Sequence, residues 1–338
     1  MTTPSLFCVR SAATLAALSV VLTACGPATF SVTFGQRDNR LTETAVLTSD
    51  DHAGSAKVAL IEVRGLIADA ATPGLISSGE NPVDRLVASL DKAAEDRSVR
   101  AVVLRIDSPG GSVTASDVMY REIARFRERT GKPVIASLST VAASGGYYIA
   151  LAADEIVTEP TCITGSIGVI FPTFNFSEAM NRWGIASRAV VSRPNKDLAS
   201  PFEPMEEEHY AILQRLVDED YARFRGLVVE RRPGLSESNL EQATDGRIFS
   251  GQQAIDLGLA DSAGGIREAF DRALAAAGVE GGRLVRYHPR GVTPRTAYAR
   301  AEAPENSPQA AGPTALEIRL PGSTEWPPAA GAYYLWMP

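Results

Sequence analysis

The chain has 338 residues, of which 45% are hydrophobic and 22% are charged, and its formal net charge is -7. This hydrophobic share is enough for a sizeable core, and the length allows one large domain or two modest ones. The acidic balance and the lack of a long basic run argue against a nucleic-acid partner.

The N-terminus reads as an export signal. Arg10 is the only charge in residues 1–24, and an apolar stretch too short to span a bilayer follows it from Ser11 to Thr23. The stretch ends in Leu22–Cys25, which resembles a lipoprotein signal in which Cys25 is acylated and becomes the mature N-terminus. Lipid chains on Cys25 would anchor the protein without a spanning helix. A plain secretory signal with an incidental cysteine is the alternative.

Residues 25–55 are polar with few periodic apolar positions, so we expect a tether there. From residue 57 on, short apolar stretches alternate with helical patterns. Strands are predicted at 58–63, 101–106, 134–138 and 155–158, and helices at 82–94, 116–129 and 142–153. This alternation predicts right-handed crossovers and an α/β fold with a mainly parallel sheet. Glycine-rich or polar turns follow Ile106 and Leu138, at strand ends where ligand sites form in such sheets.

The second half contains the longest helical pattern, at 204–232, after a short apolar strand predicted at 189–191. A short helix is expected within 245–261 and a last one at 266–276. We therefore place a folded domain at 56–280. Residues 281–338 are rich in Pro, Gly, Ala and Arg, which predicts an extended or partly disordered extension. Its aromatic end, Tyr333 to Met337, should not sit free in water.

Ser144 is a candidate nucleophile. Small residues precede it, and Gly145 and Gly146 follow it, so a substrate backbone could approach closely. A serine at a helix start also lies beside unpaired N–H groups that can bind an oxyanion. A simple helix N-cap is the alternative. The turn Pro109-Gly110-Gly111 could supply a second oxyanion donor from the Gly111 N–H, or be an ordinary turn.

A serine hydroxyl needs a base. His52 lies in the expected tether, His209 follows a run of glutamates, and His288 lies in the extension. None of the three sits at a glycine-rich strand end, which disfavours a Ser-His-Asp triad.

Lysine is the other candidate base, and the chain has four lysines against 29 arginines. A lysine base must be uncharged, so burial has to lower its pKa from about 10.4, and arginine cannot take this role. Lys196 follows the apolar strand predicted at 189–191. A solvated loop charge is the alternative. Ser166, in a stretch with two hydroxyls and two glycines, could hydrogen-bond a neutral amine or belong to a structural turn.

Together these segments resemble the signal peptide peptidase A family of Ser-Lys proteases, relatives of Clp protease and crotonase. The resemblance extends from about residue 57 to 276. The motifs that carry it are Asp107–Gly111, Ala143–Ala150, Thr164–Val169, Lys196–Asp197 with Ser200–Pro201, Asp245–Arg247 and Gly258–Asp261.

The resemblance implies a crotonase-like and Clp-protease-like α/β superhelix with one catalytic module. It implies that Ser144 is the nucleophile, that Lys196 is the base, and that Ser166 supports the lysine. The N–H groups of Gly111 and Gly145 would form the oxyanion hole. Single-module members form homo-octamers, with Lys196 expected from a neighbouring protomer. Cleaved signal peptides and other apolar, membrane-proximal peptides would be the substrates, with no metal or other cofactor.

Two departures from the family pattern bear on location and regulation. Many members carry a spanning helix where this chain has Cys25, and Gly26 rather than Asp follows that cysteine, so no inner-membrane retention signal is seen. We expect a lipid-anchored protein of the bacterial cell envelope. The aromatic end could lie in the protein's own substrate groove as an added strand, or pack on a neighbour.

Two other function classes stay open. Acyl-CoA chemistry on a crotonase fold is disfavoured by the export signal, because thioester metabolism belongs in the cytoplasm. A catalytically silent envelope scaffold is the second.

Overall fold

The structure is a computed structural model that describes residues 41–49, 55–70, 81–289, 293–299 and 333–335. The signal peptide predicted at 1–24 and the acylation candidate Cys25 lie outside these ranges. Among the described residues, no helix combines the length and apolar character that crossing a membrane requires.

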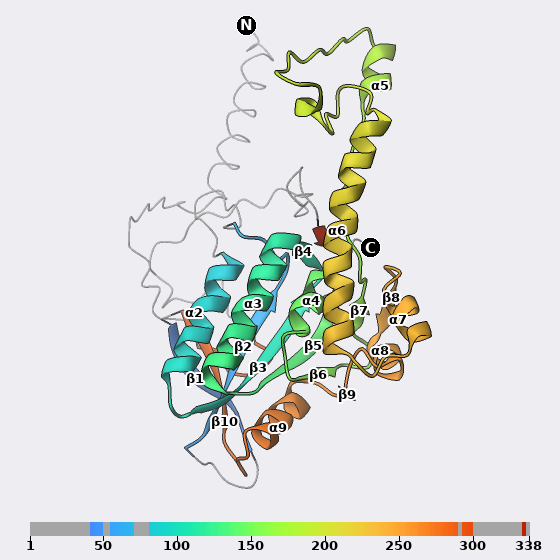
Figure 1. Cartoon of the computed structure of the whole chain (residues 1–338). Coiled ribbons are helices and arrows are strands. Elements are labelled where there is room, and N and C mark those ends of the chain that lie inside the picture. The colour runs from blue at the N-terminus through green and yellow to red at the C-terminus, as the bar shows by residue number, and fades with distance from the viewer. Residues whose placement is uncertain (1–40, 50–54, 71–80, 290–292, 300–332, 336–338) are drawn as a thin grey trace, which may run out of the picture. The chain divides into compact units, whose positions relative to one another are not determined.

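One large, mostly parallel sheet organises the chain (Figure 1). Its strands are β1 (Leu41–Thr48), β2 (Lys57–Arg64), β3 (Val99–Ser108), β5 (Val134–Ala143), β6 (Glu155–Thr158), β7 (Ile163–Gly165), β8 (Ile248–Ser250), β9 (Ser262–Ala263) and β10 (Arg283–Pro289). They follow the order β1-β10-β2-β3-β5-β6-β9, with β7 beside β5 and β8 beside β7. Only β1 with β10 and β7 with β8 pair antiparallel. The predicted α/β fold with a mainly parallel sheet is therefore confirmed.

Helices cover both faces of this sheet. The helices of the described part of the chain are α2 (Pro82–Glu95), α3 (Val113–Thr130), α4 (Gly145–Ala150), α5 (Ser177–Arg182), α6 (Glu207–Arg231), α7 (Glu237–Ala243), α8 (Gly251–Leu257) and α9 (Ile266–Ala276), of which α5 lies away from the sheet. A separate two-stranded sheet joins β4 (Gly110–Ser112) to β11 (Tyr333–Leu335).

The alternation of side chains along the inner strands explains their nearly continuous apolar sequence. In β2, Val58 and Leu60 pack in a cluster with residues of α9, whereas Ala59 and Ile61 pack with residues of α2 and α3. Successive strand residues point to opposite faces. Because helices cover both faces, most positions of the inner strands are buried, with exceptions such as Arg100 in β3 and Thr140 in β5 (Figure 1).

Several predicted elements lie close to where the sequence placed them, and one boundary matters for the site. Strand β5 was predicted to end at residue 138 but continues to Ala143, so it runs directly to Ser144. The strand predicted at 189–191 was wrong, because the described structure has no strand in that stretch. Val190 is fully exposed there. A short β-branched run has little strand preference of its own when no neighbouring strand packs against it.

The folded part also extends beyond the predicted range of 56–280. Leu41–Thr48, expected in the tether, forms β1, and Arg283–Pro289, expected in the extension, forms β10 between β1 and β2. Strand β10 was not predicted because its sequence contains polar residues that break the apolar pattern of a buried strand. Arg286 is 1% exposed and forms a buried ion pair with Glu62, and the His288 ring is bonded to the Thr44 hydroxyl at 2.9 Å.

Candidate active site

A strained turn holds Ser144 at the junction of β5 and α4. Its backbone has φ 52° and ψ -115°, outside the regions that residues with a Cβ usually occupy. Two hydrogen bonds fix it: the Ser144 N–H donates to the Gly165 carbonyl at 2.8 Å, and its own carbonyl accepts from the Tyr148 N–H at 2.8 Å. Strain of this kind persists only where the surrounding structure enforces it, and it concentrates at functional sites.

The Ser144 hydroxyl is buried and unpaired. The residue is 1% exposed, and its Oγ has no hydrogen-bond partner among the described residues. Ser144 occupies the N-cap position of α4, but its side chain makes no capping hydrogen bond, so a capping role does not account for the hydroxyl. Buried polar atoms without a partner are rare and call for an explanation. A hydroxyl held in place with no acceptor for its proton suits a nucleophile whose base comes from elsewhere.

The glycine turn after β3 presents one backbone edge toward Ser144. The Ser108 hydroxyl holds this turn, donating to the Gly65 carbonyl at 2.6 Å and accepting from the Gly110 N–H at 3.0 Å. On one edge of β4, the Ile67 N–H donates to the Gly110 carbonyl at 2.8 Å, and the Ile67 carbonyl accepts from the Ser112 N–H at 2.9 Å. Successive backbone groups of a strand point to opposite edges, so the N–H and C=O of Gly111 face the other edge.

The C-terminal strand β11 occupies that other edge. Tyr334 pairs with Gly111 in antiparallel register, and Tyr333 exchanges two hydrogen bonds with Ile170, at 2.9 and 3.0 Å. Of the two alternatives for the aromatic end, the described residues 333–335 show the added strand, while Trp336 and Met337 lie outside the described part.

The backbone carbonyl of Tyr334 lies where the glycines converge. A Cβ at Gly110 would collide with this oxygen and lie 2.7 Å from the Gly145 nitrogen. A Cβ at Gly145 would lie 3.1 Å from the same oxygen. The structure therefore brings Gly145, which directly follows Ser144, and the Gly110–Gly111 turn together around one peptide carbonyl, and it shows why side chains are excluded at these glycines.

Ser166 lies beside this turn. It directly follows Gly165, whose carbonyl binds the Ser144 N–H, and its own N–H donates to the Arg247 carbonyl at 2.7 Å. Its φ is 49°, so Ser144 and Ser166 both hold left-handed backbone. In the described structure, Ala199 is the other non-glycine residue with this property.

Lys196 is not brought to Ser144 within the chain. It lies in a 3-10 turn at Pro194–Asp197 and is exposed. Its amine has no hydrogen-bond or ion-pair partner among the described residues, and the Ser144 Oγ lacks one as well, so the two are not bonded to each other.

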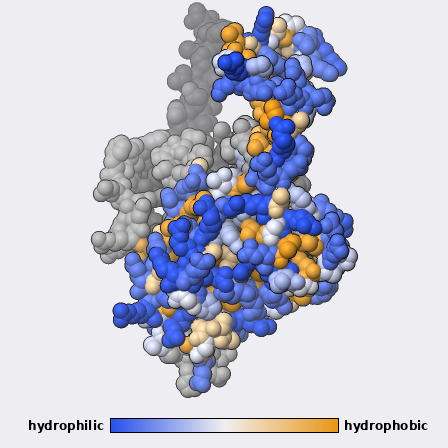
Figure 2. All heavy atoms as spheres, viewed as in Figure 1, coloured by the Kyte–Doolittle hydropathy of each residue, from blue (hydrophilic) through white to orange (hydrophobic). Residues whose placement is uncertain are grey.

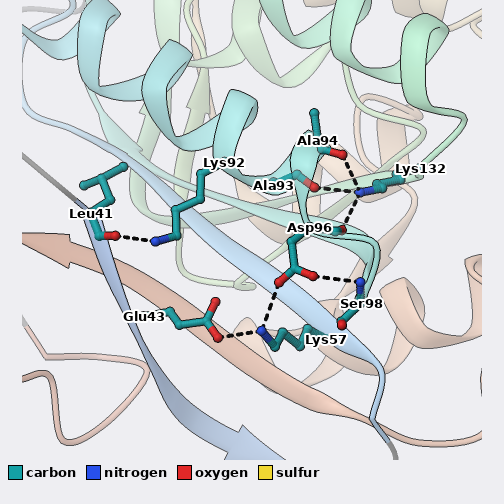
Figure 3. A network of polar contacts seen from close by, with 9 residues as sticks. All are labelled: Leu41, Glu43, Lys57, Lys92, Ala93, Ala94, Asp96, Ser98 and Lys132. Atoms are coloured by element: carbon teal, nitrogen blue, oxygen red, sulfur yellow. Dashed lines mark hydrogen bonds and ion pairs between the residues drawn. The ribbon is translucent and has the colours of Figure 1, made fainter.

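The other three lysines are engaged around the end of α2, as Figure 3 shows. The Lys132 amine donates to the carbonyl oxygens of Ala93 and Asp96 at 2.6 and 2.9 Å, and burial lowers its pKa. Lys57 bonds to Glu43 and Asp96 at 2.5 and 2.9 Å, contacts that raise its pKa. Lys92 donates to the Leu41 carbonyl. Of the four lysines, Lys196 alone has an amine that the described fold does not use.

Pattern analysis missed an aromatic pocket next to the glycine turn. Its walls are Tyr148 on α4 and Phe224 on α6, and the Tyr334 ring fills it. Tyr148 stands four residues after Ser144 in the glycine motif, which was the available signal. Phe224 is distant in sequence, and nothing local links it to the site.

Comparison with known proteins gives the family. The model of "Peptidase family S49" matches residues 127–280. The "Putative signal peptide peptidase SppA" of Enterococcus faecium is 32% identical over 233 residues, covering 69% of this chain and 66% of that protein. The "Putative protease slr0021" of a Synechocystis strain is 34% identical over 224 residues, covering 66% of this chain and 76% of that protein.

Other relatives are longer. "Protease 4" of Haemophilus influenzae is 36% identical over 219 residues, which cover 64% of this chain but only 34% of that protein. Among solved structures, the 1510-N membrane-bound stomatin-specific protease is 18% identical with a TM-score of 0.39, covering 64% of this chain and 84% of that one. With the sequence matches to family S49 and to relatives over most of the described fold, the chain belongs to the signal peptide peptidase A and protease 4 family of serine proteases.

Proposed function

We propose that the chain is an endopeptidase of the bacterial cell envelope that cleaves signal-peptide remnants and other apolar, membrane-proximal peptides. Ser144 is the nucleophile, and Lys196 of a neighbouring copy is the general base. The observation that carries the proposal is the Tyr334 carbonyl, held between Gly110–Gly111 and Gly145, the residue that directly follows Ser144 with its unpaired hydroxyl. A peptide bound in this way presents its carbonyl carbon to a nucleophile.

The chemistry follows from this arrangement. The amine of Lys196 accepts the Ser144 proton while Oγ attacks the peptide carbonyl carbon, and the N–H groups of Gly111 and Gly145 stabilise the resulting oxyanion. The ammonium then returns the proton to the leaving amine as the C–N bond breaks, which leaves an acyl-enzyme. Water, deprotonated by the same amine, attacks the ester and releases the acid and the serine. Ser166 orients the amine.

A neighbouring copy is the source of the lysine because the segment that carries Lys196 faces solvent in the single chain. Its large apolar side chains are exposed, Trp183 by 82% and Val190 by 101%. Figure 2 shows hydrophobic side chains on the surface around α5 and along α6. Exposed apolar patches of this kind mark contact surfaces. Packing this segment on another copy would bury it and dehydrate the amine, and dehydration favours an uncharged lysine.

Three further parts of the proposal rest on sequence. The copies assemble as a homo-octamer, as the family resemblance implies. Acylation of Cys25 anchors the assembly at a membrane. The substrate class follows the kind of peptidase that the Enterococcus faecium relative is named for, and the aromatic side chains that pack around Tyr334.

A serine-directed acylating inhibitor tests the proposed nucleophile. We expect a fluorophosphonate to modify Ser144 of the full chain, with the modified peptide identified by mass spectrometry, and we expect Ser144→Ala to remain unlabelled. Ser166→Ala is the matched comparison: it removes the hydroxyl proposed to orient the amine, so labelling should be slower but should still be found at Ser144. Labelling elsewhere with Ser144 unmodified would contradict the proposal, and no labelling at all would favour the silent scaffold.

A further inference from the structure

A row of charged side chains crosses the central strands on the face of the sheet that α9 covers. Glu62 stands on the same face of β2 as Val58 and Leu60, which pack in a cluster with residues of α9. The Glu62 carboxylate pairs with Arg286 of β10 on one side and with Arg105 of β3 on the other, the latter at 2.8 Å. Toward the carboxyl ends of these strands, charged residues therefore take the place that apolar residues hold near α9.

This charged row is buried, although it takes no part in the proposed reaction. Arg286 is 1% exposed, Arg105 is 9% exposed, and the Glu62 side chain is 4% exposed. Removing charges from water is costly, and the attraction within a buried ion pair often does no more than offset that cost. A role other than stability is therefore needed to explain the row, and fixing one local geometry is such a role.

The row ends at an irregular part of β5. Strand β3 pairs with β5 in register up to Leu138, and the pairing resumes at Ala142, so residues 139–141 lie opposite a single residue of β3, Asp107. At the same point β5 changes its second neighbour from β6 to β7. A bulge of this kind bends the strand that carries it, and bulges next to active sites re-aim a side chain. Here the bent strand leads, three residues later, to Ser144.

Two side chains of β3 hold this bulge. The Arg105 guanidinium donates to the Ser139 hydroxyl at 3.1 Å. The Asp107 carboxylate accepts from the Val141 N–H at 3.4 Å and pairs with Arg64 at 3.2 Å. The contact from Arg105 is the firmer one, because a buried ion pair fixes its donor, whereas the contact to Asp107 is long and that ion pair is partly exposed.

The direction of β5 matters because Ser144 is positioned through its backbone. Its φ is strained, and its hydroxyl makes no hydrogen bond among the described residues that could orient it. We propose that Arg105 is a positioning residue, which fixes the bulge at residues 139–141 through Ser139 and thereby sets the orientation of the Ser144 hydroxyl. The inference rests on the proposed function in that Ser144 is the nucleophile. Arg105 acts through β5 rather than on the reacting atoms.

The variant Arg105→Met tests this role, and Arg127→Met is the matched control. Arg127 on α3 donates to the Ala152 carbonyl at 2.7 Å and pairs with Asp154. The Asp154 carboxylate in turn accepts from the Val134 N–H, at the opposite end of β5. Both variants thus replace an arginine of an ion pair that supports the same strand, and both should lower the melting temperature of the full-length chain.

Kinetics should separate the two variants. A misplacement of about 1 Å at a reacting atom can cost on the order of 100-fold in rate. We expect Arg105→Met to lower kcat for an apolar peptide, and the rate of labelling by a fluorophosphonate, roughly 10- to 100-fold, with KM changed by less than about twofold. Arg127→Met should leave kcat and the labelling rate unchanged. Equal losses of kcat in the two variants, or an unchanged kcat in Arg105→Met, overturn the inference.

A double-mutant cycle locates the contact that transmits the effect. Ser139→Ala removes the last bond of the row and should lower kcat by roughly 3- to 10-fold. In a chain that already carries Arg105→Met, it should cause no further loss, because both substitutions remove the same interaction. Losses of kcat that multiply would contradict transmission through Ser139.

Amide hydrogen exchange distinguishes a failure of this inference from a failure of the proposed function. If the unmodified chain neither hydrolyses a peptide nor takes the label, the peptidase proposal fails. Exchange of the amides in residues 139–144 still reports how firmly the bulge is held, and it should become roughly tenfold faster in Arg105→Met but not in Arg127→Met. Unchanged exchange in Arg105→Met overturns the positioning role whether or not the chain is a peptidase.

Discussion

Two regions carry the proposed chemistry, and they are built in opposite ways. Ser144 sits in the interior, at the end of a central strand, and every group that shapes its turn comes from its own chain. Lys196 sits in residues 171–206, where most side chains are exposed and the side-chain hydrogen bonds among the described residues, such as that of Asn175 to the Glu203 carbonyl at 2.8 Å, stay within the segment. The surroundings of the proposed nucleophile therefore come from one chain, whereas the proposed base projects from that chain into solvent.

The two residues therefore differ in how far a single chain reveals their proposed roles. The strained backbone and the unpaired hydroxyl mark Ser144 within a single copy. Nothing around Lys196 in its own chain distinguishes it, apart from the fact that the other three lysines are occupied by the fold. A base supplied across an interface makes activity depend on assembly.

Exchanging lysines should give the largest effects and separate catalysis from folding. Lys196→Ala and Lys196→Arg should each lower kcat by on the order of 1,000-fold, because neither side chain can accept the proton. The melting temperature of the single chain should not change, since the Lys196 amine contacts nothing described. Lys132→Met should instead leave kcat unchanged and lower the free energy of unfolding by about 1–3 kcal/mol, because three carbonyls at the end of α2 lose their donor. Wild-type turnover by Lys196→Arg would remove the lysine from the mechanism.

Substitutions in the exposed segment should alter assembly without altering the fold. Trp183→Ser and Val190→Ser each remove a large apolar contact from the surface that the proposal buries, so sedimentation should show smaller assemblies at a given concentration. Far-UV circular dichroism should be unchanged. Val229→Ser, an apolar residue that is 46% exposed on α6 and lies outside the segment, is the control. If both segment variants assemble as the unmodified chain does, this surface does not form the contact between copies.

Unfolding measurements should detect a smaller effect, which is the loss of stability caused by the strained backbone and unpaired hydroxyl of Ser144. In chains that also carry Lys196→Ala, so that no amine reaches the hydroxyl, Ser144→Ala should raise the unfolding free energy by about 1 kcal/mol by removing a buried unpaired group. Ser144→Gly should add about another 1 kcal/mol, since glycine adopts φ 52° without strain. Ser116→Ala should lower stability instead, because that buried hydroxyl donates to the Ser112 carbonyl at 3.0 Å. A destabilising Ser144→Gly would show that the turn is not strained.

Short sequence motifs located the candidate site residues that lie next to each other in the chain or at neighbouring strand ends. Ser144, Gly111 and Gly145 stand in glycine-rich turns at the ends of buried strands, so motif and strand order together located them. Strand β10 escaped because its buried residues include Arg286 and His288, whose partners Glu62 and Thr44 are more than 200 positions away. Phe224 and Asp220 are ordinary helix residues until the tail places Tyr334 against them. No pattern within one chain specifies a contact between two copies.

Mixing two inactive chains tests the central claim most directly. Ser144→Ala keeps the base and Lys196→Ala keeps the nucleophile. If the lysine acts across the interface, random co-assembly of equal amounts should restore about a quarter of the active sites, because one pairing in four joins an intact serine to an intact neighbouring lysine. We predict that hydrolysis of an apolar peptide substrate reappears on mixing. Mixed assemblies, shown by differential tags to contain both chains, that remain inactive would contradict the account.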